Sequence, residues 1–239
     1  KEAASYLSEA LKFLPNSPEI RNNYGNALRE MGKIDEAIAQ YKITLELDPK
    51  FALARYNLGL ALATKGDYEG AIEQYRIYSG NEVNEADIRQ TLGAQLAKEG
   101  RVSDAVSQFQ KALVVKPDSA EVLSSFGYAL AQSGKPQEAI AYYDKVLAND
   151  PNNVITHGRL ALALASVGRI SEAIEHCRVV LAARPDDFEM HANLGILLQT
   201  QGKLDEAIEC YKKALQINPD FQKARENLNA ALVQKQAEK

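Results

Sequence analysis

The residues best suited to metal binding are three histidines and two cysteines, which all fall between residues 157 and 210. They are His157, His176, Cys177, His191 and Cys210. Imidazole and thiolate groups are preferred ligands of Zn²⁺, so four of these side chains would form a structural zinc site if they converged. No stretch of the sequence resembles a nucleophile paired with a base or a glycine-rich phosphate loop. The elements that carry the five residues decide whether they can converge.

Composition and charge restrict the class of protein. The chain has 239 residues, of which 46% are hydrophobic and 25% are charged, as is usual for a soluble protein with a sizeable core. The formal net charge is −4 and the lysines and arginines do not cluster, which argues against nucleic acid and anionic membranes as partners. The uncharged runs are too short and too polar for membrane insertion. Two cysteines are too few for a disulfide framework and suit a reducing compartment, so the cytoplasm is favoured although the location stays unknown.

A period of 34 residues runs through the chain. Two series of glycines follow this step, with one alanine in the place of a glycine, and a series of alanines follows it as well. The three series are Gly25, Gly59, Gly93, Gly127, Ala161 and Gly195; Gly32, Gly66, Gly100, Gly134, Gly168 and Gly202; and Ala37, Ala71, Ala105, Ala139, Ala173 and Ala207. A fixed period of this length is typical of a repeat protein, in which each unit is one supersecondary element.

Each 34-residue unit is predicted to form a helical hairpin. In the first unit, Tyr24 and Leu28 lie on one face of a first helix, here called helix A. Gly32 stands where a left-handed glycine cap would end helix A. Tyr41 belongs to the apolar face of a second helix, helix B, and Pro49 ends that helix because proline cannot continue it. Equivalent residues in the later units predict the same hairpin.

The glycine inside helix A needs a physical reason, because glycine there costs about 1 kcal/mol relative to alanine. We expect Gly25 to face Ala37 across the hairpin, so that the two helices approach each other at the short end of the ~8–10 Å range. Leu28 and Tyr41 would then fill the space on either side. The glycine is thus predicted to exchange helix propensity for close packing.

Residues at matching positions of two units carry a resemblance to a known family. They are Leu58-Gly59, Leu62, Ala71 and Tyr75, and Leu194-Gly195, Leu198, Ala207, Tyr211 and Pro219. This pattern resembles the tetratricopeptide repeat, W-x2-L-G-x2-Y…A-x3-F…P, although the tryptophan is absent throughout. The resemblance implies an all-α fold, namely a right-handed α-solenoid (superhelix) of antiparallel helix-turn-helix repeats.

The resemblance extends over nearly the whole chain and predicts a single solenoid over residues 1–239. The predicted parts are a lone helix B at 1–17, full repeats at 18–51, 52–85, 86–119, 120–153, 154–187 and 188–221, and a polar C-terminal capping helix at 222–239. The first helix would have no helix A to cover its apolar face. We therefore expect either that the chain is part of a longer protein or that this helix takes part in self-association.

In the repeat family, helix A lines the concave face of the superhelix. On that basis, the predicted groove residues are Asn23, Asn26, Leu53, Tyr56, Asn57, Leu60, Tyr128, Arg159, Leu162, Asn193 and Ile196. The apolar members would bind an apolar or amphipathic segment of a partner. The asparagines have both a donor and an acceptor for a peptide main chain. Two alternatives stay open: the asparagines bond only neighbouring helices or water, and the apolar residues are partly buried against neighbouring repeats.

The predicted function is that of a protein-interaction scaffold or adaptor, which binds an extended or helical segment of a partner protein in its groove. The alternative is the substrate-recognition region of a larger enzyme, such as an O-linked glycosyltransferase, whose asparagine row this sequence resembles except at Thr91, Ser125 and Arg159. Some repeat domains of this family bind the acidic C-terminal tails of chaperones through a carboxylate clamp of lysine or arginine. That function is excluded, because Asp87 and Thr91 stand where the clamp needs cations.

On this fold the five residues that opened the sequence do not converge. Two of the histidines would lie on helices A, and the other three residues would lie on helices B. Cys177 replaces an aromatic core residue, which explains it as a small hydrophobe. We therefore expect no metal, no cofactor and no catalytic residue in this chain.

Overall fold

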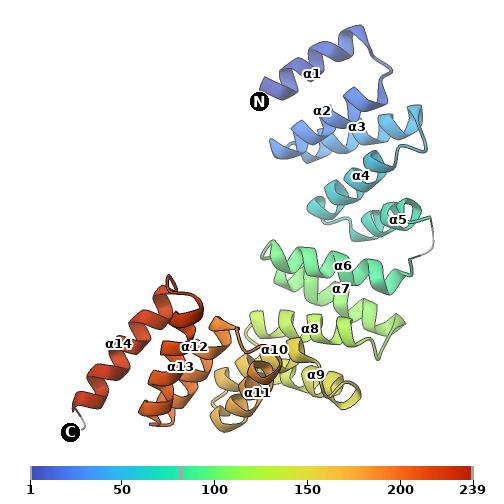
Figure 1. Cartoon of the computed structure of the whole chain (residues 1–239). Coiled ribbons are helices and arrows are strands. Elements are labelled where there is room, and N and C mark those ends of the chain that lie inside the picture. The colour runs from blue at the N-terminus through green and yellow to red at the C-terminus, as the bar shows by residue number, and fades with distance from the viewer. Residues whose placement is uncertain (1, 81–82, 238–239) are drawn as a thin grey trace. The chain divides into compact units, whose positions relative to one another are not determined.

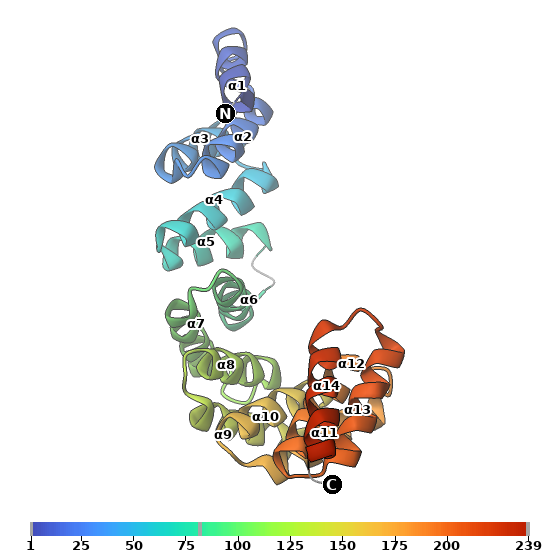
Figure 2. The same ribbon diagram turned by 90° about the vertical axis from the view of Figure 1, so that its left-hand side faces the viewer.

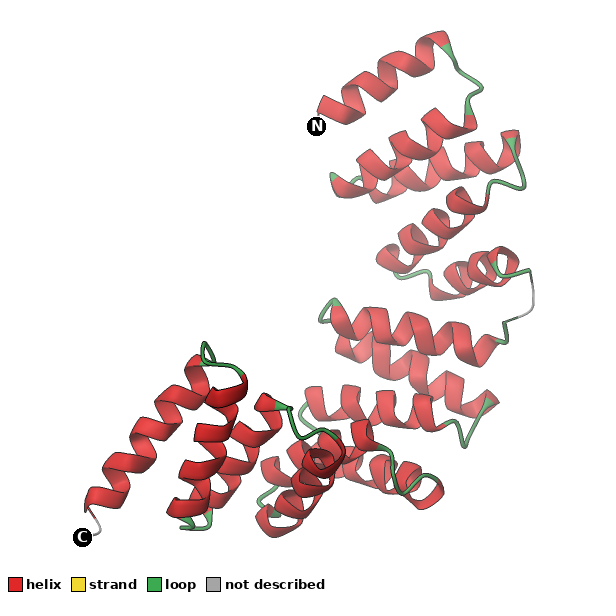
Figure 3. Cartoon of the chain, in the orientation of Figure 1, coloured by secondary structure: helices red, strands yellow, loops and turns green. Residues whose placement is uncertain are grey.

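The computed structural model describes residues 2–80 and 83–237. Within these residues it contains fourteen α-helices and no strand, so the prediction of an all-α fold is confirmed (Figures 1 and 3). The predicted ranges 1–17, 52–85 and 222–239 each include residues outside the described part, and the division into repeats stays a prediction.

The chain forms two compact units, Lys1–Leu92 and Gly93–Lys239. The helices that begin in the first unit are α1 (Glu2–Phe13), α2 (Pro18–Glu30), α3 (Ile34–Leu47), α4 (Ala52–Lys65), α5 (Tyr68–Tyr78) and α6 (Glu85–Lys98). Those of the second unit are α7 (Val102–Val115), α8 (Ala120–Gln132), α9 (Pro136–Asn149), α10 (Val154–Ser166), α11 (Ile170–Ala183), α12 (Phe188–Thr200), α13 (Leu204–Ile217) and α14 (Gln222–Ala237).

Consecutive helices pack on one another within each unit. In the first unit, α1 packs on α2, and the series continues through α3 and α4 to α5. In the second unit, the same neighbour packing runs from α7 to α14 (Figure 2). The hairpins α2–α3, α4–α5, α8–α9, α10–α11 and α12–α13 are therefore the building blocks of the two units. This arrangement places α2 and α4, and likewise α8, α10 and α12, in the role predicted for helix A.

Glycine ends the first helix of a hairpin, as the sequence predicts. Gly66 caps α4 with φ of 93°, a left-handed conformation that side chains with a Cβ rarely adopt. The next amide, that of Asp67, donates to the carbonyl of Leu62 at 2.9 Å and closes the helix end. The Asp67 side chain then accepts from the amide of Gly70 at 3.0 Å and begins α5. One short turn therefore ends one helix and starts the next.

The glycine inside the first helix of a hairpin lies closest to an aromatic ring of the second helix. A Cβ on Gly25 would lie 2.6 Å from Cε1 of Tyr41, which is too close for any real contact. The same holds for four more pairs, Gly59–Tyr75, Gly93–Phe109, Gly127–Tyr143 and Gly195–Tyr211. In the predicted fifth repeat, Ala161 stands for the glycine and Cys177 for the ring, and both are buried. Alanine is larger than glycine, and cysteine is smaller than an aromatic residue. The two changes therefore compensate each other in volume, as close packing requires.

The N-terminal helix exposes large apolar side chains. Ala4 of α1 is buried, whereas Tyr6 and Phe13 of α1, and Leu14 directly after it, are exposed. The helix packs on α2. Self-association through this helix stays a prediction.

Candidate partner-binding surfaces

The first candidate surface lies on α2 and α4 and consists of Asn23, Asn26, Leu53, Tyr56, Asn57 and Leu60. Leu53 is 61% exposed and Tyr56 is 40% exposed, although both are large and apolar. The Tyr56 ring packs against the rings of Tyr75 and Tyr78, with centroid distances of 5.8 and 5.5 Å. Leu60 is half-buried beside them. An aromatic and aliphatic patch therefore faces solvent on α4.

Two asparagines of this first surface make hydrogen bonds within the chain. The Tyr41 hydroxyl donates to Oδ1 of Asn26 at 2.8 Å. Nδ2 of Asn57 donates to Oδ1 of Asn22 at 3.0 Å and so joins α4 to α2. Asn23 is exposed. For Asn26 and Asn57, these contacts match the alternative in which the asparagines bond neighbouring helices.

The second candidate surface lies on α8, α10 and α12 and consists of Tyr128, Arg159, Leu162, Asn193 and Ile196. Tyr128 is 42% exposed and Leu162 is 53% exposed, whereas Asn193 and Ile196 are half-buried. The structure brings Tyr128, Arg159 and Leu162 together around one cavity, and Asn193 and Ile196 are not among its lining residues.

Arg159 is held in place by a stack and by a hydrogen-bond chain. Its guanidinium carbon lies 5.2 Å from the centroid of the Tyr128 ring, within the range of a cation–π interaction. Its Nη1 donates to Oγ of Ser124 at 2.8 Å. That hydroxyl lies 3.2 Å from Oγ1 of Thr156, and both hydroxyl residues are buried. The hydrogen bond to Ser124 and the stack on Tyr128 thus hold the guanidinium in place. Its other N–H groups remain available as hydrogen-bond donors.

Two cavities of about 300 Å³ each share Tyr128 and Arg159 as walls. The first is lined by Tyr128, Ala131, Gln132, Pro136, Tyr143, Arg159, Leu162, Ala163 and Ser166. The second is lined by Ala94, Ala97, Lys98, Phe109, Ser125, Tyr128 and Arg159. Sequence reasoning missed Tyr143 and Lys98. Tyr143 occupies a core position of the 34-residue period. The one sequence signal that it borders a cavity is Tyr128, which stands where the first predicted repeat has Asn26.

Comparison with known families decides the class of this chain. Models of the tetratricopeptide repeat match residues 6–39, 92–154, 130–195 and 188–221, and a TPR repeat model matches residues 25–66. The chain belongs to the tetratricopeptide repeat (TPR) family. The resemblance inferred from the period is therefore confirmed.

Solved TPR structures share the fold of this TPR chain. The APC/C hetero-tetramer Cut9–Hcn1 matches with a TM-score of 0.62 and 19% identity, over 97% of this chain and 46% of that chain. YrrB, described as a TPR protein with an unusual peptide-binding site, matches with a TM-score of 0.51 and 20% identity, over 93% of this chain and 97% of its own. MamA from Desulfovibrio magneticus RS-1 matches with a TM-score of 0.61 and 25% identity, over 64% and 87%. The chain thus spans about half the length of the Cut9–Hcn1 chain, and no curated protein matches it in sequence.

The TPR fold and these TPR neighbours support a protein-interaction scaffold in general. TPR proteins of this kind are generally non-catalytic. Among the helices described, none is long and apolar enough to cross a lipid bilayer.

The histidines of this TPR chain tie helices to the preceding turns. Nε2 of His157 lies 2.9 Å from the carbonyl oxygen of Pro151, which can only accept, so this nitrogen carries the proton. Nδ1 of His157 therefore accepts from Nδ1 of His176 at 2.8 Å. In the predicted first repeat, Arg21 makes both contacts, to the carbonyl of Pro15 and to Gln40. The His157–His176 pair thus replaces an arginine–glutamine pair with a structural role.

The cysteines are buried thiols. Burial raises the pKa of Cys177 to about 12 and the pKa of Cys210 to about 11, so neither forms a thiolate readily near neutral pH. Within residues 2–80 and 83–237, no group of three or more His, Cys, Asp or Glu side chains is placed to hold a metal ion.

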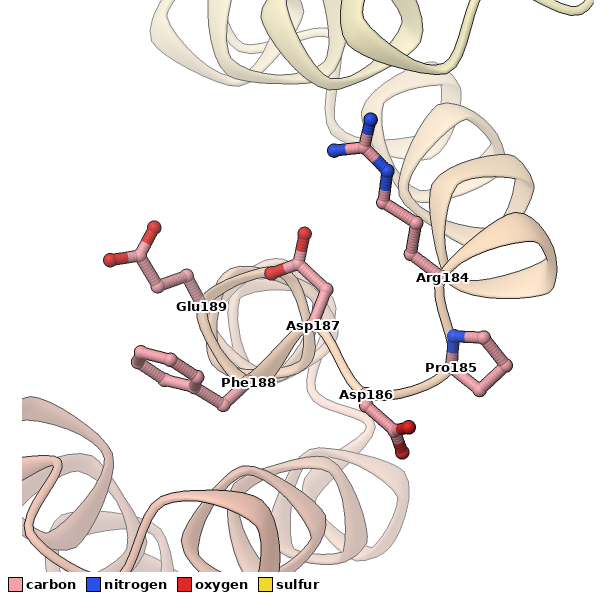
Figure 4. Close-up of a pocket in the computed structure, with 6 residues that line it drawn as sticks. All are labelled: Arg184, Pro185, Asp186, Asp187, Phe188 and Glu189. Atoms are coloured by element: carbon pink, nitrogen blue, oxygen red, sulfur yellow. The ribbon is translucent and has the colours of Figure 1, made fainter.

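A third cavity, of about 540 Å³, lies at the turn between α11 and α12 and is lined by Arg184, Pro185, Asp186, Asp187, Phe188 and Glu189 (Figure 4). Figure 4 shows Asp186 pointing away from the side on which Arg184 and Asp187 lie. Asp187 accepts from the amide of Met190 at 2.9 Å and so caps α12. Phe188 packs edge-on against Phe221, with ring centroids 5.0 Å apart. These two residues therefore already have structural roles, and we assign no binding function to this turn.

Proposed function

We propose that the chain is a TPR scaffold that binds a segment of a partner protein, extended or helical, on the first helices of its hairpins. The observation that carries this proposal is the exposure of large apolar side chains on these helices, at Leu53, Tyr56, Tyr128 and Leu162. Each of them keeps at least 40% of its surface exposed, including Tyr56, whose ring packs against Tyr75 and Tyr78 of the same hairpin. Exposed apolar clusters on a folded protein mark interaction sites.

The energetics favour a partner at both surfaces. Burial of one such side chain against a partner would contribute roughly 1.5–3 kcal/mol. Tyrosine in particular combines a large apolar area with a polar tip and is common among interface residues that dominate binding. The cavities beside Tyr128 also offer space for side chains of the bound segment. We therefore expect side-chain anchoring to supply most of the affinity, with main-chain contacts at Asn23 and Asn193 in a secondary role.

The substrate-recognition region of a larger enzyme, such as an O-linked glycosyltransferase, would use the same helices with catalysis elsewhere. That alternative depends on a row of asparagines available to a peptide main chain. Asn57 and Asn26 already bond Asn22 and Tyr41 within the chain, so the scaffold is the better supported function.

Affinity capture with three variants tests the proposal. The first variant, Leu53→Ala with Tyr56→Ala, removes the first surface, and the second, Tyr128→Ala with Leu162→Ala, removes the other. Val114→Ala is the matched control, because Val114 is an exposed apolar residue of α7 outside both surfaces. We expect the set of captured proteins to shrink with at least one of the double variants and to stay unchanged with the control. An unchanged set with both double variants would contradict the proposal.

A further inference from the structure

Arg159 is a half-buried cation without a counter-ion. No carboxylate of residues 2–80 or 83–237 forms an ion pair with it. The buried Arg89 of the first unit, by contrast, pairs with Glu69 and with Glu85 at 2.7 Å each. A partly buried charge is costly unless it is paired, and the neutral contacts of Arg159 with Ser124 and Tyr128 leave its charge unbalanced. The second surface therefore favours an anion.

The Tyr143 hydroxyl provides a second polar group at the same cavity. Tyr143 is 1% exposed and lines the cavity, and its hydroxyl makes no hydrogen bond within the described part of the chain. At two equivalent positions the hydroxyl donates within the chain, from Tyr41 to Asn26 at 2.8 Å and from Tyr211 to Gln199 at 2.9 Å. Tyr128 occupies the position of Asn26, and within the described residues it makes no hydrogen bond with Tyr143. Burial raises the pKa of Tyr143 to about 12, so its hydroxyl is a donor at neutral pH.

The charge of both cavities has one sign. Among the described residues, Arg159 is the only charged one that lines the first cavity, and Lys98 joins it in the second. The remaining walls are mainly apolar or aromatic and include Leu162 and Phe109. A volume of about 300 Å³ can hold one side chain with an apolar stem. The walls thus suit an anionic head group on a short carbon chain, next to an apolar neighbour.

We propose that this subsite binds an aspartate or glutamate side chain of an extended partner segment. Its carboxylate accepts from the free guanidinium donors of Arg159 and from the Tyr143 hydroxyl, and an adjacent apolar side chain of the segment packs on Leu162. This inference rests on the proposed function and names the partner chemistry of the second surface. A phosphorylated residue at the same place is an outcome that the experiment below distinguishes.

The test begins with a displayed library of random 12-residue peptides, selected on the full chain. Enriched sequences are expected to share an acidic residue next to an apolar one. A synthetic peptide of an enriched sequence is then compared with the same peptide in which that acidic residue is replaced by its amide, and with one in which it is replaced by phosphoserine. The amide peptide is expected to bind at least about tenfold more weakly, because it leaves the half-buried Arg159 cation unpaired. Tighter binding of the phosphoserine peptide than of the acidic peptide would show that the subsite prefers a phosphate to a carboxylate.

Three variants locate the contact. Arg159→Gln is expected to weaken binding of the acidic peptide at least about tenfold and to leave the amide peptide nearly unchanged. Tyr143→Phe keeps the ring that packs on Gly127 and is expected to weaken the acidic peptide about threefold or more. Arg169→Gln is the matched control, because Arg169 is an exposed arginine that pairs with Glu172 on another part of the unit. Unfolding midpoints of all variants show whether the fold is intact.

The possible failures are distinguishable. Enriched peptides that lack an acidic residue, or acidic peptides that bind Arg159→Gln as well as the wild type, would overturn this inference. If those peptides still lose affinity with Tyr128→Ala and Leu162→Ala, or with Leu53→Ala and Tyr56→Ala, the proposed function stands without it. A library that yields no peptide bound to either surface would count against both.

Discussion

Asn57 in the first unit and Arg159 in the second unit occupy the same place in the predicted repeats, and each donates to the preceding repeat. Asn57 bonds Asn22 at 3.0 Å and Arg159 bonds Ser124 at 2.8 Å. The first bond joins two neutral amides, whereas the second orients a cation. The comparison teaches that the hydrogen bond between repeats can be kept while the chemistry of the exposed surface changes.

A second difference accompanies the first. Where the first unit has Asn26, which accepts from the Tyr41 hydroxyl, the second unit has Tyr128, which stacks on Arg159. The exchange leaves the Tyr143 hydroxyl at a cavity wall. Two substitutions relative to the first unit thus add a cation, and a ring that stacks on it, to the second surface, while the core of the hairpin is retained.

The largest expected effect comes from erasing this difference. Tyr128→Asn with Arg159→Asn gives the second surface the residues of the first, and we expect the loss of about 2–4 kcal/mol of binding free energy for the acidic peptide. Isothermal titration calorimetry measures it. The converse variant, Asn26→Tyr with Asn57→Arg, is the control for the first unit and is expected to leave this binding unchanged. Wild-type affinity of Tyr128→Asn with Arg159→Asn for the acidic peptide would show that these two residues do not distinguish the surfaces.

The next effect concerns the core, in which the two units also differ. Gly59 in the first unit faces the ring of Tyr75, whereas the second unit has Ala161 with Cys177 at the corresponding positions. Gly59→Ala is expected to reduce the free energy of unfolding by about 1–3 kcal/mol through overpacking. In a Tyr75→Cys background the same change is expected to be neutral or stabilising, because the ring is gone and alanine favours the helix. Denaturant titrations of the four proteins measure the coupling, and equal effects in both backgrounds would disprove the steric explanation.

A smaller effect is expected on the stability of the fold at acidic pH. Burial lowers the pKa of His176, the neighbouring His157 lowers it further, and Asp144, Glu172 and Glu175 act in the opposite direction. The folded state therefore favours neutral His176, and its contribution to stability is present above the ordinary histidine pKa near 6.5 and is lost as pH falls through the lowered value. His157→Arg with His176→Gln installs the pair that Arg55 and Gln74 form in the first unit.

This double variant is expected to lose less stability than the wild type between pH 7.5 and 5.5, by less than about 1 kcal/mol. Denaturant titrations at the two pH values measure the difference, and the effects of carboxylates away from the histidine pair cancel because they are common to both proteins. An identical acid dependence would show that the histidine pair does not respond to pH.

The smallest effect is expected at Lys98. Lys98 lines the second cavity, beside Arg159, and is an exposed residue, so its attraction to a bound carboxylate is screened by salt. Lys98→Gln is expected to weaken the acidic peptide about twofold at low salt and not at all at high salt. A loss as large as that of Arg159→Gln would move the anion site to the second cavity.

The fold could be predicted from the sequence because its period is fixed by packing. Gly32 and its equivalents need a left-handed backbone, and the apolar faces of both helices repeat at the same step. The partner of Gly25 could not be predicted, because spacing along a helix does not fix which residue of the second helix it meets. The structure places the Tyr41 ring closest to Gly25.

The candidate surfaces could be predicted only in part. The exposure of Tyr56 and Tyr128 followed from their place on the first helices of the hairpins. The internal bond of Asn57 and the cavity beside Tyr143 depend on side chains of neighbouring helices, whose directions a single sequence does not contain. Whether these surfaces bind a partner stays a prediction.

A double-mutant cycle between the chain and its peptide tests the central claim most directly. The cycle combines Arg159→Gln with the replacement of the acidic peptide residue by its amide, and calorimetry gives the four binding free energies. A direct contact predicts a coupling of at least about 1.5 kcal/mol. A coupling near zero would show that the second surface does not recognise a carboxylate through Arg159.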